Sequence, residues 1–396
     1  MKPAPPVIRA LLKPIFEPFI IGRAPRLLYG FKGYISFFSN IFLYWVIHLA
    51  KIRVGLIGVG NCASAIVQGV YYYSSAGKEG YKGLKYPNIG GFHPEDVEFV
   101  CAFDVAKGKV GKDLSEAIFA PPNNSPKIAE VPRLGVEVLK GPVMDGLNEY
   151  ARKIIEVDAS REVDVAGKLM ESGVEMVINL LPGGAQKASL WYAEESLKAG
   201  CAFINATPTI IASDPAWDIR FHKAGLPIVG DDLMDQVGAT FIHKTVLEAL
   251  AKRGVSISET YQLDVGGGME SADIERVWGT KRIIKTKTVE STLPYKASVV
   301  AGSTDFVEFL GNRRDSYIWV SGTYFGGASF EMEIRLNTLD APNAGSILLD
   351  VIRSVKIALN RGDAGHILPI SAYAFKHPSK ILPLQEAEKL FEEYIK

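Results

Sequence analysis

The sequence predicts an α/β fold, with a parallel sheet followed by a second part of the α+β type. A short β-branched strand at residues 52–57 ends at a glycine turn, and a helical pattern of apolar residues follows the turn. From there to about residue 237, short apolar strands alternate with helical segments, which is typical of a parallel sheet. Beyond residue 238 the strands alternate apolar and polar residues, as antiparallel strands with one open face do.

The glycine turn reads Gly58-x-Gly60-x-x-Ala63, a pattern that predicts a dinucleotide-binding site in a Rossmann-type domain. Gly58 permits a tight turn, Gly60 lets the backbone approach a pyrophosphate, and the small Ala63 lets helix and strand pack closely. The helix that follows offers N–H groups and a positive dipole end, with Asn61 and Cys62 as candidate coenzyme contacts. The alternative is a purely structural strand-to-helix turn.

An acid, Asp104, ends the second predicted strand, residues 97–104. In dinucleotide-binding folds an acid at this place accepts hydrogen bonds from the adenosine ribose and disfavours a 2′-phosphate, so the expected coenzyme is NAD. Its separation from the glycines is well over the usual ~20 residues, which makes the connection at 74–96 a large insert. The alternative is that Asp104 only caps the next helix.

Three further strands, at residues 174–181, 202–206 and 227–232, each end in glycine or polar residues. Because the carboxyl ends of parallel strands meet at one edge of the sheet, these ends predict the nicotinamide and substrate side, including Pro208 and Asp232.

Four segments follow from these patterns. Residues 1–50 are an N-terminal extension, and 51–237 form the Rossmann-type NAD-binding domain. Residues 238–340 form an inserted α+β domain for catalysis and oligomerisation, because broad sheets of this kind often serve as subunit interfaces. Residues 341–396 return to the first domain, with a helical apolar stripe at 346–359 that we interpret as core.

Composition excludes several classes of function. The 396 residues are 47% hydrophobic, and 44 basic residues balance 44 acidic ones, so a nucleic-acid partner is not expected. The three cysteines, Cys62, Cys101 and Cys201, are scattered, which favours buried thiols in a reducing, cytoplasmic compartment. The six histidines have no paired spacing, so the sequence identifies no metal ligands.

The first fifty residues are basic, with Glu17 the single acid, and residues 34–50 contain no Lys, Arg, Asp or Glu. That stretch is at the short edge of a membrane span. A span with the basic end in the cytoplasm would carry the nucleotide domain outside, where little NAD is free. Three interpretations stay open: an over-long reading frame or disordered extension, a membrane-surface or anchoring segment, and a structural addition.

Cations gather after the glycine segment at 266–268. Lys281 and Lys285 share a face if their segment is helical, and Lys287 is nearby. Lys376 stands alone among apolar residues, and Arg314 belongs to an arginine pair. A phosphorylated sugar would need such cations, and a desolvated lysine can act as acid or base. A solvated lysine face is the alternative.

Several motifs, in order along the chain, resemble one enzyme family. They are Gly58-Val-Gly-Asn-Cys-Ala-Ser64, Phe103-Asp-Val, Asp113-Leu-Ser-Glu-Ala-Ile-Phe-Ala, Ala212-Ser-Asp-Pro-Ala-Trp217, Val229-Gly-Asp-Asp232, Gln236-Val-Gly-Ala-Thr240, Tyr261-Gln-Leu-Asp-Val-Gly-Gly267, Asp340-Ala-Pro-Asn343 and Pro369-Ile-Ser-Ala-Tyr373. From about residue 52 to the C-terminus, the chain resembles the archaeal and bacterial branch of the myo-inositol-phosphate synthases.

The resemblance implies conversion of D-glucose 6-phosphate to 1D-myo-inositol 3-phosphate with catalytic NAD. The family oxidises the open-chain sugar at C5, closes the ring by an intramolecular aldol step and reduces the product ketone again. It also implies a homo-oligomer, a tetramer, and a divalent or monovalent cation near the coenzyme phosphates.

Site residues follow from the same resemblance. The implied catalytic residues are Lys281, Lys285, Lys376, Arg314 and Asp340. The implied coenzyme contacts, besides the glycine turn and Asp104, are Asp113, Tyr192, Pro208, Asp232, Asp235, Glu270 and Lys281. Asp232 and Asp340 match acidic positions that orient the lysines or hold the cation.

The sequence departs from the family pattern at several of these positions. Met234-Asp235 stands where the family has Lys-Ser, Gly268 and Glu270 replace an asparagine and an aspartate, and Arg314 replaces a lysine. Two alternatives therefore remain beside the synthase: a diverged NAD-dependent enzyme acting on another sugar phosphate, and a catalytically impaired NAD-binding or membrane-associated regulatory protein.

Overall fold

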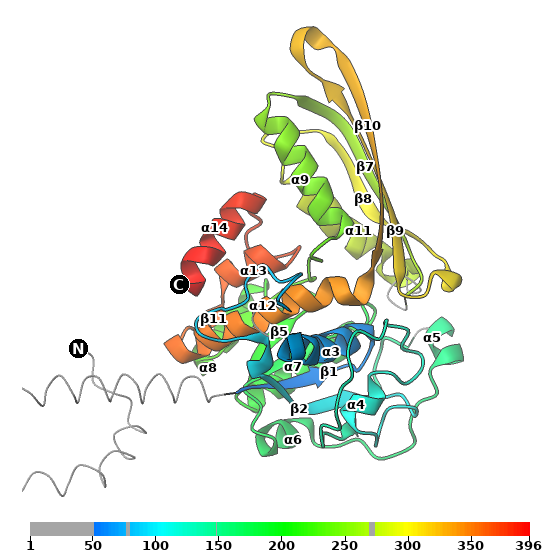
Figure 1. Cartoon of the computed structure of the whole chain (residues 1–396), viewed down its shortest axis with the longest axis vertical. Helices are drawn as coiled ribbons and strands as arrows, with labels where there is room; N and C mark the ends of the chain where they lie inside the picture. The colour runs from blue at the N-terminus through cyan, green and yellow to red at the C-terminus, as the bar shows by residue number, and fades with distance from the viewer. Residues whose placement is uncertain (1–50, 77–79, 148, 269–273) are drawn as a thin grey trace, which may run out of the picture. The chain divides into compact units, whose positions relative to one another are not determined.

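The strand before the glycine turn lies inside a seven-stranded parallel sheet (Figure 1). The computed structural model describes residues 51–76, 80–147, 149–268 and 274–396. The strand order is β11-β6-β5-β4-β1-β2-β3, and every neighbouring pair is parallel. The strands are β1 (Ile52–Ile57), β2 (Val97–Asp104), β3 (Val138–Lys140), β4 (Met176–Asn179), β5 (Ala202–Asn205), β6 (Pro227–Val229) and β11 (Gly365–His366).

The strand order reverses between β1 and β4, as in a Rossmann-type sheet. The predicted fold class is thereby confirmed. Ligands of such sheets bind outside the carboxyl ends of the strands at this reversal, which is where the glycine turn after β1 and the loop after β4 begin.

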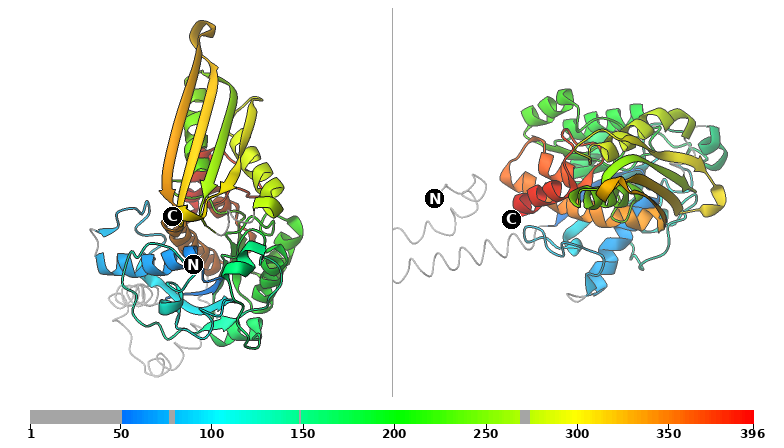
Figure 2. Two further views of the ribbon diagram at one scale, coloured as in Figure 1. Left: turned by 90° about the vertical axis from the view of Figure 1, so that its right-hand side faces the viewer. Right: turned by 90° about the horizontal axis from the view of Figure 1, so that it is seen from above.

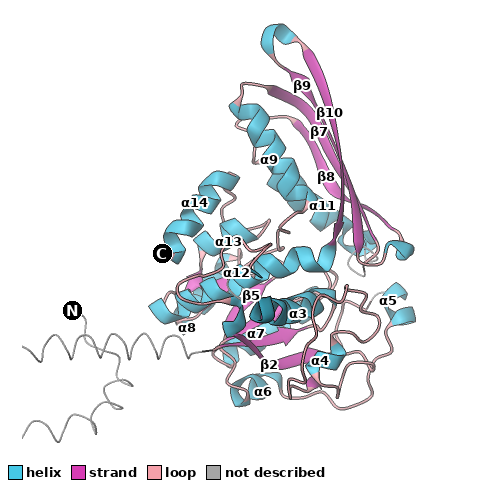
Figure 3. Cartoon of the chain, viewed as in Figure 1, coloured by secondary structure: helices cyan, strands magenta, loops and turns pink. Residues whose placement is uncertain are grey.

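Helices cover both faces of this sheet, so β1 is buried almost throughout (Figure 3). Val54 and Leu56 belong to one apolar core and Ile57 to the other. The helices are α3 (Asn61–Ala76), the 3₁₀ helix η3 (Pro94–Asp96), α4 (Leu114–Ala117), α5 (Glu149–Ile154), α6 (Val165–Glu171), α7 (Gln186–Lys198) and α8 (Pro215–Ala224).

A second, four-stranded sheet has the order β10-β9-β7-β8 (Figure 1; Figure 2). Its strands are β7 (Ser256–Gly266), β8 (Ser298–Phe306), β9 (Arg313–Thr323) and β10 (Ser329–Leu339). Two helices, α9 (Ala239–Lys252) and α11 (Ile274–Glu290), pack on one face of it. Short 3₁₀ turns, η4 (Glu308–Leu310) and η5 (Phe325–Gly327), flank β9.

The expectation that this second sheet is antiparallel is wrong for one pair of strands. β7 and β8 run parallel, whereas β7–β9 and β9–β10 are antiparallel. Parallel neighbours need a crossover connection, and α11 supplies it between β7 and β8. The lysine-rich stretch at 281–287 is therefore a crossover helix.

The long helix α12 (Asp340–Arg361) runs from the end of β10 back to the first sheet (Figure 1). It packs on α3, and Gly345 lies close enough that an added Cβ would be 3.7 Å from Cβ of Ala65. The prediction that residues 346–359 form a core helix is confirmed, since most of them are buried in α12. After it come β11, α13 (Leu368–Ala374) and α14 (Leu384–Ile395).

Across the described residues, we find no helix with the length and apolar character needed to cross a membrane. The predicted membrane-associated stretch at 34–50 lies outside those residues.

Candidate functional site

The glycine turn leaves open space at the start of α3. Gly58 has a φ of +85°, and its N–H donates to the Phe103 carbonyl at 2.9 Å. A Cβ on Gly58 would be 3.2 Å from the Leu180 carbonyl oxygen, so a side chain has no place there. A Cβ on Gly60, in contrast, would meet nothing within 4 Å. The backbone is thus bare beside a helix N-terminus, as a pyrophosphate requires.

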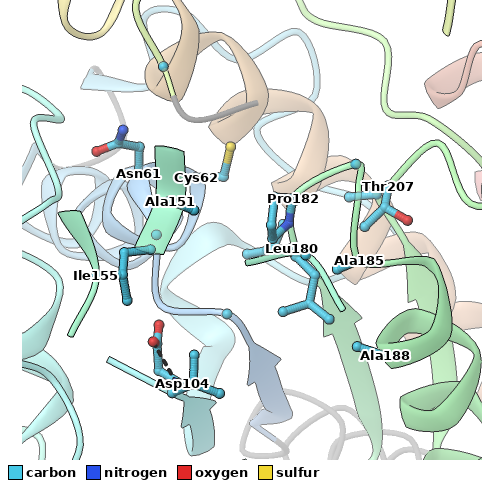
Figure 4. Close-up of a pocket in the computed structure, with 18 of the residues that line it drawn as sticks. Asn61, Cys62, Asp104, Ala151, Ile155, Leu180, Pro182, Ala185, Ala188 and Thr207 are labelled. Atoms are coloured by element: carbon cyan, nitrogen blue, oxygen red, sulfur yellow. Dashed lines mark hydrogen bonds between the residues drawn. The ribbon is translucent and has the colours of Figure 1, made fainter. Parts of the chain in front are cut away.

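A cavity of about 300 Å³ opens at this turn (Figure 4). Figure 4 shows Asn61 and Cys62 at the start of α3, with Leu180, Pro182 and Thr207 across the cavity. Its wall also includes residues at the end of the second sheet and the beginning of α12. Of the residues predicted from the sequence, it is lined by Gly58, Gly60, Asn61, Cys62, Asp104, Tyr192, Pro208, Asp232, Asp235, Arg314, Asp340 and Lys376.

Asp104 holds the glycine turn as well as facing the cavity. Its Oδ2 accepts a hydrogen bond from the Val59 N–H at 2.8 Å, and its Oδ1 accepts from the N–H groups of Val105 and Ala106 at 2.7 and 2.9 Å. The next α-helix, α4, begins only at Leu114, so Asp104 does not cap a helix. The carboxylate orders the turn after β2 at the place where an adenosine ribose would bind.

Lys109, which the sequence pattern did not single out, is buried beside Asp104. Its Nζ donates to the Val59 carbonyl at 2.8 Å and to Oδ1 of Asn123 at 2.9 Å, and it lies 3.8 Å from Oδ2 of Asp104. Burial lowers the pKa of Lys109, while the Asp104 charge opposes that change. Lys109 therefore links the glycine turn, Asp104 and the loop at Asn123.

Asn61 fixes the same loop against the start of α3. Its Nδ2 donates to Oδ1 of Asn124 at 2.9 Å, and its Oδ1 accepts from the N–H groups of Asn124 and Ser125 at 2.8 and 2.9 Å. The side chain of this predicted coenzyme contact thus shapes the cavity wall.

Asp113 lies elsewhere and does not line the cavity. It is the N-cap of α4, and its carboxylate accepts from the N–H groups of Ser115, Leu134 and Gly135 at 3.0, 3.0 and 2.6 Å. Burial opposes ionisation of Asp113, but these hydrogen bonds outweigh it and lower its pKa. Its contacts are those of a structural cap.

Tyr192, by contrast, is buried on α7 at the cavity wall, and burial raises the pKa of its hydroxyl.

Two of the predicted lysines form buried ion pairs. Nζ of Lys285, on α11, donates to Oδ2 of Asp264, on β7, at 2.7 Å. Nζ of Lys376 donates to Oδ1 of Asp232 at 3.1 Å and to the Leu233 carbonyl at 2.7 Å. Lys285 is only 4% exposed and Lys376 only 7%, so the solvated-face alternative is wrong for both.

The Lys285–Asp264 pair keeps both groups charged. Burial favours the neutral carboxyl, but the charges of Lys285 and Arg314 bring the pKa of Asp264 down to about 2. Burial also favours neutral Lys285, and the charge of Asp264 outweighs it and raises the lysine pKa. The sequence pattern did not single out Asp264, because an acid inside a strand does not indicate its partner on a later helix.

Arg314 and Asp340 make a third pair between the second sheet and α12. An Nη2–Oδ2 hydrogen bond of 2.9 Å joins them. Burial raises the pKa of Asp340, with Arg314 opposing the rise and Asp235 adding to it.

Burial and the charges of Asp235 and Asp340 also raise the pKa of Cys62 to about 12, so that thiol stays protonated at neutral pH.

A small polar compartment adjoins the cavity at the beginning of α9. Asp235, Arg314 and Lys376 line both spaces, and Lys285 and Asp264 line the compartment alone. The first residues of α9, Ala239 to Phe241, complete the wall, and its N-cap, Gly238, supplies no side-chain hydrogen bond. Two buried lysines and the partly buried Arg314, each paired with an aspartate, lie at an uncapped helix N-terminus, and the free N–H groups of that terminus suit an anion such as a phosphate.

Two predicted residues cannot be placed in the site. Glu270 lies outside the described residues, and for Lys281 the backbone is described within α11 but the side chain is not. Among the side chains that are described, no three of His, Cys, Asp or Glu are arranged to hold a metal ion.

Comparisons with known proteins identify the family. The family model for myo-inositol-1-phosphate synthase matches residues 238–341. The inositol-3-phosphate synthase of Corynebacterium glutamicum is 41% identical over 358 residues, covering 87% of this chain and 98% of the relative. That of Mycolicibacterium smegmatis is 42% identical over 358 residues, covering 88% and 99%.

Solved structures give the same result for the fold. Inositol-3-phosphate synthase from Caenorhabditis elegans has a TM-score of 0.70 at 14% identity, covering 87% of this chain and 85% of that one. The crystal structure of Ari2 has a TM-score of 0.70 at 29% identity, covering 87% of this chain and all of that one. Since the curated relatives match along nearly their whole length, the chain belongs to the myo-inositol-1-phosphate synthase family and is an enzyme of that family.

Proposed function

We propose that this enzyme converts D-glucose 6-phosphate to 1D-myo-inositol 3-phosphate with NAD that is oxidised and reduced within each turnover. The observation that carries the proposal is that one cavity joins the glycine turn of a dinucleotide site to Lys376, Arg314 and Asp340. The names of relatives that are 41 and 42% identical support the same reaction.

The described residues fit NAD. Open space at Gly60 and the start of α3 suits the pyrophosphate. Asp104 faces the cavity with a carboxylate that suits a ribose diol and repels a 2′-phosphate. Nζ of Lys109 donates to Val59 and Asn123, and its charge is balanced by Asp104 at 3.8 Å. These features favour NAD over its 2′-phosphorylated form.

The chemistry supplied by bound NAD is acceptance of hydride from C5 of the sugar and its return at the end of the cycle. The protein must hold the phosphate, move protons at oxygen and carbon, and stabilise the oxyanions that develop in the aldol step. Protein groups for all three tasks lie within the cavity and the polar compartment beside it.

The substrate phosphate is best held where the two spaces meet. Arg314 and Lys376 line both, and the first turn of α9 points its backbone dipole to the same place. Lys285 lines only the polar compartment, where its charge is balanced by Asp264 and the pair keeps the wall in place. The phosphate in this place leaves the rest of the sugar in the larger cavity, towards the nicotinamide side.

Lys376 is the group best suited to move a proton. It lines the cavity, and Asp232 and the Leu233 carbonyl hold its Nζ in a fixed position. Arg314 stays charged and cannot readily shuttle a proton, so its role is to stabilise an oxyanion. Oδ1 of Asp340 is buried and makes no hydrogen bond to any other described residue, which leaves it able to accept one from a sugar hydroxyl.

A second candidate is the same chemistry on another sugar phosphate. Arg314 and Asp235 favour it, because they stand together at the junction of cavity and compartment where the family pattern has a lysine and a serine. The added carboxylate near the arginine changes the charge that a substrate meets.

The test is to incubate the full chain with NAD and glucose 6-phosphate, and to measure inositol phosphate and free NADH. We expect inositol phosphate without net NADH. NADH that accumulates would favour the second candidate, and bound NAD without turnover of any sugar phosphate would favour a regulatory protein.

We also propose a homotetramer, formed through the face of the second sheet that points away from α9 and α11. Tyr261, Tyr317 and Trp319 form an aromatic row there, with ring centroids 6.1 and 5.4 Å apart. Light scattering on the full chain tests the subunit number.

The coenzyme and the sugar phosphate are metabolites of the cytoplasm, where we propose that the enzyme works.

A further inference from the structure

The seven residues 141–147, which we name the strap, follow β3 and lie along α7. At one end Gly141 lies against the Tyr192 hydroxyl, where a Cβ would collide with it. At the other end a Cβ on Gly146 would be only 2.6 Å from Cβ of Ala185, and the φ of Gly146 is +88°. Glycine at both positions lets the strap lie directly on the helix.

Asp145 ties the strap to the first turn of α7. Its Oδ2 accepts a hydrogen bond from the Lys187 N–H at 2.7 Å, and its Oδ1 accepts from the Ala188 N–H at 3.0 Å. The residue at the N-cap of α7, Ala185, has no side chain that could serve. Asp145 therefore caps this helix from more than forty residues away, and its charge also complements the helix dipole.

The strap is one wall of the coenzyme cavity. Figure 4 shows Ala185, the N-cap of α7, and Ala188 at the cavity. The strap residues that line the same cavity are Pro142, Val143, Met144, Asp145, Gly146 and Leu147. Two helix N-termini, those of α3 and α7, open towards this space. Asp145 places a carboxylate at the N-terminus of α7, where it would repel a pyrophosphate. The N-terminus of α3 is therefore the more favourable place for the pyrophosphate to bind.

We propose that Asp145 is a positioning residue that holds the strap in place and so retains the reduced coenzyme between the two hydride transfers. The inference rests on the proposed function, in which the hydride taken from C5 returns to the product ketone. If NADH leaves between these steps, an oxidised sugar is stranded and that turnover is lost. A loop held to a rigid helix by two hydrogen bonds closes the cavity wall without any contact to the reacting atoms.

The experiment measures how fast NADH leaves the enzyme. Wild-type protein and Asp145→Ala are loaded with NADH, mixed with excess NAD, and followed by NADH fluorescence. Asp164→Ala is the matched control, because Asp164 caps α6 through the Gly167 N–H at 3.1 Å and does not line the cavity. We expect release at least about tenfold faster from Asp145→Ala, since lost interactions act mainly on dissociation rates, and a change within about twofold for the control.

Asp145→Asn serves if the alanine variant does not fold, because it keeps one acceptor oxygen and loses the charge. It should release NADH at an intermediate rate. With glucose 6-phosphate present, both variants should leak NADH that lactate dehydrogenase and pyruvate can oxidise, while wild-type enzyme leaks little. Release at the wild-type rate from the variants overturns the proposal. If wild-type protein makes no inositol phosphate, the proposed function fails, but the release rates still decide the role of Asp145.

Discussion

Lys376 and Asp232 are joined by an ion pair of 3.1 Å, although 144 residues separate them in the sequence. The backbone supports the pair, since the Lys376 N–H donates to the Asp232 carbonyl at 2.7 Å. The segment after α13 is thereby fixed beside the carboxyl end of β6. The lysine faces the cavity from a position that neither segment would define alone.

Replacing Lys376 should stop the chemistry without releasing the coenzyme. For Lys376→Met we expect kcat to fall at least ~100-fold, the usual scale of a lost general acid or base, and NAD affinity to stay within about twofold. Lys380→Met is the control, because Lys380 is exposed and close in sequence. Steady-state rates and NAD titrations measure both effects, and an unchanged kcat would exclude Lys376 from the reaction.

Lys109 should matter for coenzyme binding and not for the chemical step. Lys109→Met removes the hydrogen bonds to the Val59 carbonyl and Asn123 and leaves Asp104 without its cation. We expect the Kd for NAD to rise about tenfold, equivalent to about 1.4 kcal/mol, with kcat at saturating NAD nearly unchanged. The exposed Lys112 gives the control, Lys112→Met. Equal NAD affinity in the two variants would contradict this role.

Arg314 should act as a fixed charge. Arg314→Lys preserves the charge at neutral pH and introduces a group that titrates, so kcat should stay within about tenfold of wild type near pH 7 and acquire an alkaline decline. Arg314→Met should lose at least ~100-fold, because the oxyanion site and Asp340 both lose their cation. A pH profile of kcat distinguishes these outcomes. If Arg314→Met retains full activity, the arginine has no part in catalysis.

The Lys285–Asp264 pair should make stability depend on pH in acid. The folded-state pKa of Asp264, about 2, lies below its ordinary value of 3.8. Its contribution is therefore present above about pH 4 and is lost as the pH falls towards 2, with a size on the order of 2 kcal/mol. Thermal unfolding between pH 5 and 2 should show a steeper loss of stability in wild-type protein than in Asp264→Asn.

A control for acid stability is Asp305→Asn, which removes an exposed carboxyl of β8. Its unfolding curve should keep the wild-type dependence on pH. Parallel curves for wild type and Asp264→Asn would mean that the buried pair does not favour the ionised carboxyl.

The sequence predicts well what depends on neighbouring residues. Gly58 indicates a tight turn because its positive φ favours glycine, and Gly60 indicates an open approach because it has no side chain. The ends of apolar strands indicate one edge of the sheet. The placement of Asp104 at the end of β2 follows in the same way. These features use only local pattern and the geometry of parallel strands.

Contacts between distant segments are harder to predict. Three residues have partners far away in the sequence or on another element: Lys109, Asp145 and Asp264. The residues next to each of them in the sequence do not indicate which partner it has. Asp113 shows the reverse case, since a motif match suggested a coenzyme contact and the side chain caps α4. The parallel pairing of β7 and β8 was missed because the alternating pattern of a strand does not reveal its direction.

The most direct test of the account uses glucose 6-phosphate with deuterium at C5 and unlabelled NAD. If one cavity holds the coenzyme through both hydride transfers, the inositol phosphate formed keeps the deuterium, even when unlabelled NADH is present in solution. Mass spectrometry of the product measures this retention. Product that has lost the deuterium would contradict the account, because the hydride would then have exchanged with the free coenzyme.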